Sequence, residues 1–169
     1  MIIRVFTGLF VSFLSATAFA APLWQNVESG MTASQVRLAQ PDAQIDANPT
    51  RLGGGATCDL SIPSLDVGGD AYKVCFFMLD GKLLEVMLTA LEPTQPMFDS
   101  TIELLRGKYG TELAGGHPLC TMIGIMKNCE ANWLLKSGVN ISALLIKIDD
   151  METMNIVYQT RMAKDASKL

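Results

Sequence analysis

The chain has 169 residues, of which 13 are Lys or Arg and 17 are Asp or Glu, so its formal net charge is −4 at pH 7. It contains no run of lysine or arginine that would neutralise a phosphate backbone or bind an anionic membrane surface, which argues against nucleic acid as a partner. A chain of this length fits one domain with a real hydrophobic core.

The first twenty residues have the pattern of a secretory signal peptide. Arg4 precedes an uncharged apolar stretch over residues 5–19, and Ala18-Phe19-Ala20 supplies the small-x-small pattern of a cleavage site. The apolar run is shorter than the roughly 20 residues of a membrane-spanning helix. We therefore expect residues 1–20 to be a signal peptide, residues 21–169 to be a single α+β domain, and the mature protein to be periplasmic or secreted without a stable membrane anchor.

A short amphipathic helix is predicted over residues 32–40. Thr32 and Gln35 have the spacing of a capping box. In a capping box the threonine oxygen accepts from an unpaired backbone N–H of the first turn, and the glutamine side chain accepts from the backbone N–H of the threonine. Ala33, Val36 and Ala39 then fall on one face, and Pro41 follows.

Period-two alternation predicts three strands, over residues 57–63, 72–79 and 82–90. Asp80-Gly81 between the last two is a strong signal for a two-residue hairpin turn. That turn predicts the pairs Leu79–Lys82, Phe77–Leu84 and Cys75–Val86. It collects one set of side chains on one face of the sheet: Cys58, Leu60, Cys75, Phe77, Leu84, Val86 and Leu88.

The opposite face of this hairpin is also apolar, and two interpretations stay open. Either other parts of the chain cover it, or it is an adaptable, methionine-containing surface for a partner or an apolar ligand. The residues of this candidate partner surface are Val74, Phe76, Met78, Leu83 and Met87.

A second helix is predicted over residues 94–110, with Pro96 in its first turn and Gly110 at its end. Four further strands are expected near residues 119–125, 129–136, 139–148 and 153–161. This order predicts an α+β fold, with two helices packed on a mainly antiparallel sheet of about six or seven strands. A duplicated helix-plus-sheet unit would have the same order of elements.

Four cysteines, Cys58, Cys75, Cys120 and Cys129, favour two disulfides in an exported chain. Three connectivities are possible. We favour Cys58–Cys75 and Cys120–Cys129, because each pair flanks a predicted hairpin. Zinc binding would need closer pairs, and a reactive thiol would need a histidine partner.

We expect no catalytic residues, no metal and no cofactor. The single histidine, His117, is interpreted as a turn residue, and no G-x-S-x-G motif supplies a serine nucleophile. The acidic residues Asp149, Asp150 and Glu152 lack the glycine and ligand spacing of a calcium-binding loop, so they are interpreted as a solvated turn.

One pattern near the predicted mature start is typical of a known family. Its residues are Trp24, Val27, Gly30, Met31, Thr32, Gln35 and Val36. The pattern resembles the start of SmpA/OmlA-type envelope domains (the BamE family), and the element order resembles the β-lactamase inhibitor protein, which has two helix-plus-sheet repeats. The family's lipidated cysteine is missing here. The resemblance implies a non-enzymatic, protein-binding module of the bacterial envelope.

The function expected from these observations is an exported protein-interaction module, namely an assembly accessory, an inhibitor or a scaffold. Its partner would be another envelope or secreted protein. A carrier of an apolar ligand is the alternative, and a hydrolase that uses two carboxylates is a further one.

Overall fold

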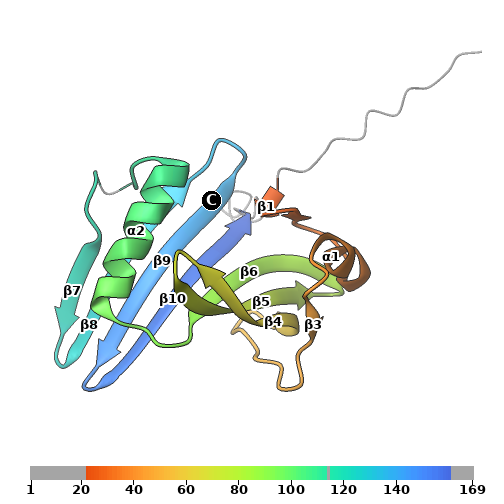
Figure 1. Ribbon diagram of the computed structural model, residues 1–169, viewed down its shortest axis with the longest axis horizontal. Helices are drawn as coiled ribbons and strands as arrows, with labels where there is room; N and C mark the ends of the chain where they lie inside the picture. Colours follow the sequence, from red (N-terminus) through yellow and green to blue (C-terminus); the bar gives the residue numbers. More distant parts are fainter. Residues whose placement is uncertain (1–21, 114, 161–169) are drawn as a thin grey trace, which may run out of the picture.

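A computed structural model describes residues 22–113 and 115–160 (Figure 1). The predicted signal peptide, residues 1–20, lies outside the described residues. None of the helices in the described ranges is long and apolar enough to cross a membrane.

The described chain forms a large antiparallel sheet of eight strands, a separate two-stranded sheet and two helices. The eight strands lie in the order β3-β4-β5-β6-β10-β9-β8-β7. The elements are β1 (Pro22–Trp24), β2 (Val27–Glu28), α1 (Ala33–Ala39), β3 (Gln44–Ile45), β4 (Thr57–Val67), β5 (Asp70–Leu79), β6 (Lys82–Ala90), α2 (Gln95–Tyr109), β7 (Leu119–Ile123), β8 (Met126–Leu134), β9 (Val139–Ile148) and β10 (Met151–Thr160).

The order of the strands divides the large sheet into two meanders. Helix α1 precedes β3 to β6, helix α2 precedes β7 to β10, and the two meanders join where β6 pairs with β10. This junction is antiparallel and runs from the pair Asn155–Thr89 to the pair Gln159–Glu85. One sheet therefore extends through both halves of the chain (Figure 1).

The predicted fold class, two helices on six or seven strands, is wrong, because the described chain has ten strands and is mostly sheet. The sequence missed β1, β2 and β3. Each of these strands has only two or three residues, which is too short to show an alternating pattern.

The two predicted helices are confirmed, together with the Thr32 capping box and the end of the second helix at Gly110, whereas the cap at Thr94 was not predicted. The Thr32 side chain accepts from the backbone N–H of Gln35, whose side chain in turn accepts from the Thr32 N–H, as a capping box requires. The Thr94 hydroxyl accepts from the backbone N–H of Met97 at 3.2 Å and caps α2. Gly110 ends this helix with a φ of 83°, a conformation that suits glycine.

The Asp80-Gly81 turn is present, but the predicted register beyond it is wrong. Both turn residues have positive φ, and Leu79 pairs with Lys82 as expected. A bulge at Leu84 then moves the pairing by one residue, so Phe77 lies opposite Glu85 and Cys75 opposite Met87. A one-residue slip transfers side chains to the other face of a sheet.

The bulges in β4 and β6 decide which side chains form the main core. One cluster of buried residues lies between the sheet and the two helices, and in it Trp24 packs against Phe76 at a ring separation of 6.0 Å. Leu60, Val86 and Leu88 belong to this cluster. Cys58, Cys75 and Phe77, which the predicted register placed beside them, lie on the opposite side of the sheet in a second, smaller cluster.

Both favoured disulfides are present. Cys58 and Cys75 join β4 to β5 with a Cα–Cα distance of 5.5 Å. Cys120 and Cys129 lie directly opposite each other in β7 and β8, with a Cα–Cα distance of 4.0 Å. Two disulfides are compatible with an exported protein.

Replacing Phe76 by Ala should destabilise the protein by about 3–5 kcal/mol, because a fully buried aromatic side chain leaves a cavity. Urea denaturation measures this loss. Leu38→Ala is the matched control, because Leu38 is 83 % exposed and its truncation should change stability by less than about 0.5 kcal/mol. Equal losses in the two variants would contradict the assigned core.

Removing the Cys58–Cys75 bridge by a double Ser substitution should cost on the order of 3 kcal/mol in unfolding free energy. The Cys120–Cys129 bridge closes a shorter loop, 9 residues apart in sequence instead of 17, so its removal should cost about 0.6 kcal/mol less by chain entropy. Calorimetry of the two double variants checks the order. A larger loss from the β7–β8 bridge would contradict it.

Candidate functional site

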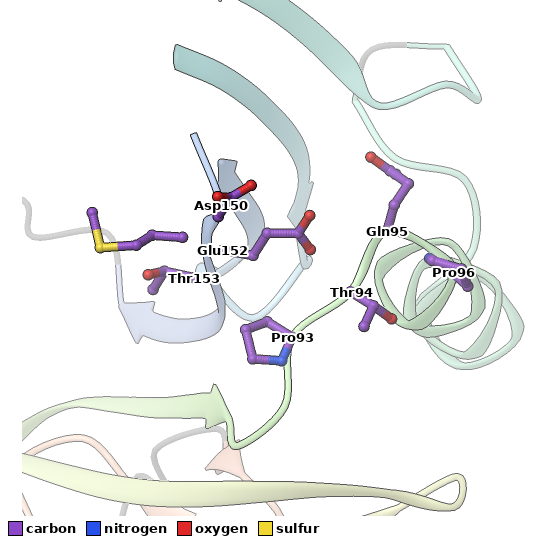
Figure 2. A pocket seen from close by; sticks show the side chains of 8 residues that line it. Pro93, Thr94, Gln95, Pro96, Asp150, Glu152 and Thr153 are labelled. Carbon is purple, nitrogen blue, oxygen red and sulfur yellow. The ribbon is translucent and has the colours of Figure 1, made fainter. Parts of the chain in front are cut away.

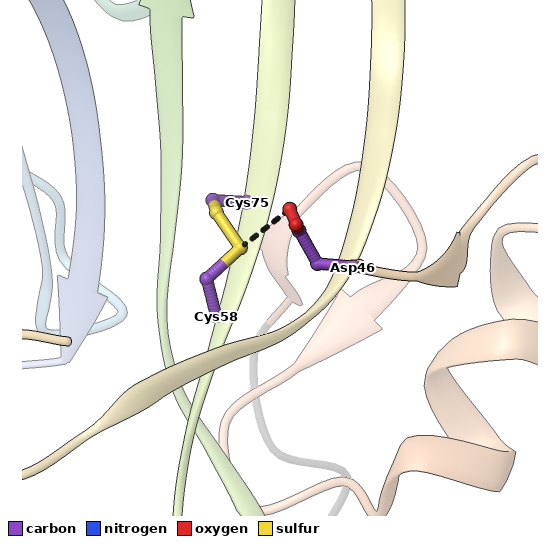
Figure 3. Close-up of side chains that lie close together, drawn as sticks. All are labelled: Asp46, Cys58 and Cys75. Atoms are coloured by element: carbon purple, nitrogen blue, oxygen red, sulfur yellow. Dashed lines mark hydrogen bonds between the residues drawn. A yellow bond between two sulfur atoms is a disulfide. The ribbon is translucent and has the colours of Figure 1, made fainter. Parts of the chain in front are cut away.

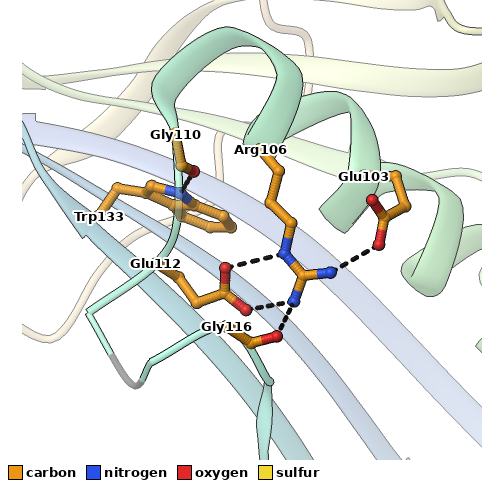
Figure 4. Close-up of polar contacts among 6 residues, drawn as sticks. All are labelled: Glu103, Arg106, Gly110, Glu112, Gly116 and Trp133. Atoms are coloured by element: carbon orange, nitrogen blue, oxygen red, sulfur yellow. Dashed lines mark hydrogen bonds and ion pairs between the residues drawn. The ribbon is translucent and has the colours of Figure 1, made fainter.

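The most buried ion pair holds the loop between α2 and β7. The guanidinium of Arg106 binds the Glu112 carboxylate through two N–H groups, and it also donates to the Gly116 carbonyl at 2.6 Å and to Glu103 at 2.6 Å (Figure 4). The Glu112 side chain is fully buried, and hydrogen bonding from Arg106 lowers the pKa of its carboxyl. A carboxylate held this firmly as an anion is a structural anchor and a poor proton carrier.

A second group of polar side chains lies beside the Cys58–Cys75 disulfide. Asp46 Oδ2 is 3.6 Å from Cys58 Sγ (Figure 3). The same oxygen is 2.6 Å from Lys73 Nζ. Lys73 lowers the pKa of the Asp46 carboxyl by donating to it. Asp46, Cys58 and Cys75 have the mutual distances of a metal site, but sulfurs joined in a disulfide are not thiolates and do not ligate metal. Their role here is to fix the loop that precedes β4.

A wide pocket of about 740 Å³ lies where the segment before α2 meets the β9–β10 turn (Figure 2). Pro93 to Pro96 form one wall, and Asp150 to Thr153 form the other. Its lining contains no histidine or cysteine, and Glu152 is already bound to Lys147 at 2.8 Å. Ligand sites are mostly apolar and enclosing, so we assign no ligand or reaction to this pocket.

The polar residues singled out in the sequence lie beside these groups: Asp150 and Glu152 line the pocket, and His117 follows Gly116, whose carbonyl accepts from Arg106. His117 is exposed at a bend before β7, and Asp149 and Asp150 form the exposed turn between β9 and β10. The turn assignments are confirmed for His117, Asp149 and Asp150, whereas the assignment of Glu152 is wrong, because Glu152 lies in β10 and pairs with Lys147.

The structure places the candidate partner surface mostly inside the protein. Val74, Phe76, Met78 and Leu83 are at most 3 % exposed and belong to the main core, while Met87 is half-buried beside the second cluster. The interpretation that other parts of the chain cover this face therefore holds for four of the five residues. Phe76 packs against Trp24 of β1, so it is a packing residue.

A different surface is available on the other side of the sheet. Both helices pack on one face, and we call the face directed away from them the open face. In β8, β9 and β10 its residues alternate with the buried ones and line up in rows across the strands. One row runs Asn128, Ile146, Thr153, and the next runs Glu130, Leu144, Asn155.

The open face over β4 to β6 is covered by a loop of the chain, whereas the open face over β7 to β10 is not covered by any described element. Over β4 to β6, the loop of residues 46–56 brings Leu52 and Ala56 onto the second cluster around Phe77. Over β7 to β10, no described element covers the sheet, and aliphatic side chains are partly or largely exposed. We call this set the open patch: Leu119, Ile123, Met126, Leu134, Leu144, Ile146, Ile148, Met151 and Val157.

The open patch contains hydrogen-bonding groups but little charge. Ser142 donates to Asn132 at 2.5 Å, and Asn132 donates to Glu130 at 2.7 Å. Glu130 is the one charged residue that β7 to β10 present on this face within the described ranges. Depletion of charge at the centre of a surface is typical of protein interfaces.

Glu85 lies at the border between the two halves of the open face, opposite Phe77 in β5 and Gln159 in β10. The residue is 8 % exposed, and burial raises the pKa of its carboxyl. The ionised form is therefore disfavoured in the folded protein.

The sequence missed the open patch because both faces of residues 133–148 are apolar, so the local pattern does not show which face the helices cover. Comparison of the chain with protein-family models, with curated proteins and with solved structures finds no match. The resemblance to SmpA/OmlA-type domains and to the β-lactamase inhibitor protein stays a prediction from the sequence.

Replacing Glu85 by Gln should stabilise the protein at pH 7, because it removes the cost of burying a charge. A raised carboxyl pKa favours folding below the carboxyl's unfolded pKa, and this contribution is lost as pH rises through the folded value. The advantage of the variant should therefore shrink as pH falls. Thermal unfolding across pH checks this, with exposed Glu92→Gln as the control. An advantage that grows toward low pH would contradict the assignment.

Proposed function

We propose that this protein is an exported, non-enzymatic interaction module that binds another envelope or secreted protein through the open patch. The main support is that the aliphatic face of β7 to β10 is uncovered, whereas the equivalent face of β4 to β6 is covered by the loop of residues 46–56. A contiguous exposed apolar surface on a folded domain marks an interaction site.

The size of the open patch suits a protein partner. Four strands at about 4.8 Å spacing and about 3.3 Å per residue give a surface of roughly 19 Å by 30 Å. This is about 570 Å², which is smaller than the roughly 800 Å² that each partner buries in a standard interface and close to the roughly 600 Å² of a small, transient one. The Asn and Ser side chains between the aliphatic residues offer the hydrogen bonds that such interfaces contain.

The form of the surface favours a protein over a small apolar ligand. Small-molecule sites are concave and enclose most of the ligand surface, whereas the open patch is a face of a sheet with Met151 71 % exposed and Ile123 67 % exposed. A flat partner surface or a loop fits this face better than an enclosed molecule does.

A photo-crosslinking side chain placed at Ile146 in the living source cell should capture one reproducible protein. The same side chain at Leu104, which is 48 % exposed on α2, is the matched control and should capture little. Adding Val157→Lys on the neighbouring strand should reduce the Ile146 crosslink tenfold or more, because it buries a charge in the interface.

Equal crosslinking from Ile146 and Leu104, or none from Ile146, would contradict the proposed surface. A stoichiometric lipid found on the protein by native mass spectrometry, with no protein crosslink, would instead support the ligand carrier.

A further inference from the structure

Strand β7 forms an open edge of the large sheet. It pairs with β8 on one side and has no described neighbour on the other. All five of its residues are exposed, and Leu119, Met122 and Ile123 are 63 %, 67 % and 67 % exposed. An edge strand presents unpaired N–H and C=O groups that can pair with another strand.

The register with β8 identifies which backbone groups face outward. Cys120 and Cys129 lie opposite each other with a Cα–Cα distance of 4.0 Å, which is the close spacing of a non-hydrogen-bonded pair. The N–H and C=O of Cys120 therefore point away from β8. The same holds for Met122, two residues along the strand.

This edge lacks the usual protection against pairing. Folded proteins protect open edges with charged residues, proline, bulges or very short strands. Residues 119–125 contain no charge and no proline, and the β7–β8 register is free of bulges. The opposite edge, β3, is only two residues long and is followed by Asp46, which is paired with Lys73.

We propose that β7 pairs with β7 of a second copy of this chain, antiparallel about a two-fold axis at Thr121. Cys120 of each copy then lies opposite Met122 of the other, and their outward N–H and C=O groups form four hydrogen bonds. Thr121 of one copy lies opposite Thr121 of the other as a non-hydrogen-bonded pair, and Leu119 of each copy lies opposite Ile123 of the other.

The self-pairing is favoured over pairing with an unrelated strand because β7 is complementary to itself. The register places no like charges opposite each other and brings the exposed Leu119 and Ile123 together. A two-fold interface uses the same surface on both copies. The pairing also makes the open faces of two copies continuous, as one sixteen-stranded sheet.

The test uses two opposite charges at the proposed axis. Thr121→Glu and Thr121→Lys each place like charges opposite each other in the dimer, so each variant alone should dimerise at least tenfold more weakly than the wild type. An equal mixture should recover the dimer, because Glu then faces Lys. Sedimentation velocity from about 1 μM to about 1 mM covers the range expected for an interface this small.

Thr153→Glu and Thr153→Lys are matched controls, since Thr153 is exposed on the same face but lies in β10, away from the edge. These variants should dimerise like the wild type, and circular dichroism confirms that every variant is folded. A wild-type protein that stays monomeric throughout the range would overturn the proposal. A dimer that the Thr121 charges do not weaken would also overturn the proposal. A dimer that the mixture of Glu and Lys variants does not restore would overturn the proposed register and would point to a different strand pairing.

Discussion

The pairing of β6 with β10 holds the two halves of the chain in one sheet. Each half of the chain is a four-stranded meander preceded by a helix, and each meander by itself would leave a second open edge. Five residue pairs, from Asn155–Thr89 to Gln159–Glu85, close both edges at once. The junction also places both helices on one face, so the two halves share one hydrophobic core and one open face.

The polar and covalent links act mainly on the loops around this sheet. Arg106 and Glu112 fix the segment that leads from α2 to β7, and Asp46 with Lys73 fixes the loop before β4. That loop covers the open face of the first half by placing Leu52 beside Phe77. The second half has no equivalent cover among the described residues, and this difference is the basis for assigning the interaction surface to β7 to β10.

The sequence predicted the features that local chemistry determines. The capping box of Thr32 and Gln35 predicted the first helix, Pro96 and Gly110 indicated the ends of the second, Asp80-Gly81 predicted the hairpin, and the cysteine positions favoured the observed disulfides. It did not predict the bulge at Leu84, because β6 is apolar on both faces, so the change of phase that an extra residue causes does not show in the pattern. That single residue places Val86 opposite Phe76 and moves Glu85 and Met87 to the other face of the sheet. The β6–β10 junction joins segments about 70 residues apart, so no local pattern predicts it, and the open patch depends on that junction.

Hydrogen exchange of the native protein, measured strand by strand, tests whether the two meanders form one sheet. Amides of β6 and β10 should exchange only through global unfolding and should share the highest opening free energy with the core strands β5 and β9. This result would show that the junction is as stable as the meanders that it joins. Opening of β7 to β10 as a separate unit, at a much lower free energy than β4 to β6, would contradict the single sheet and the continuous open face that depends on it.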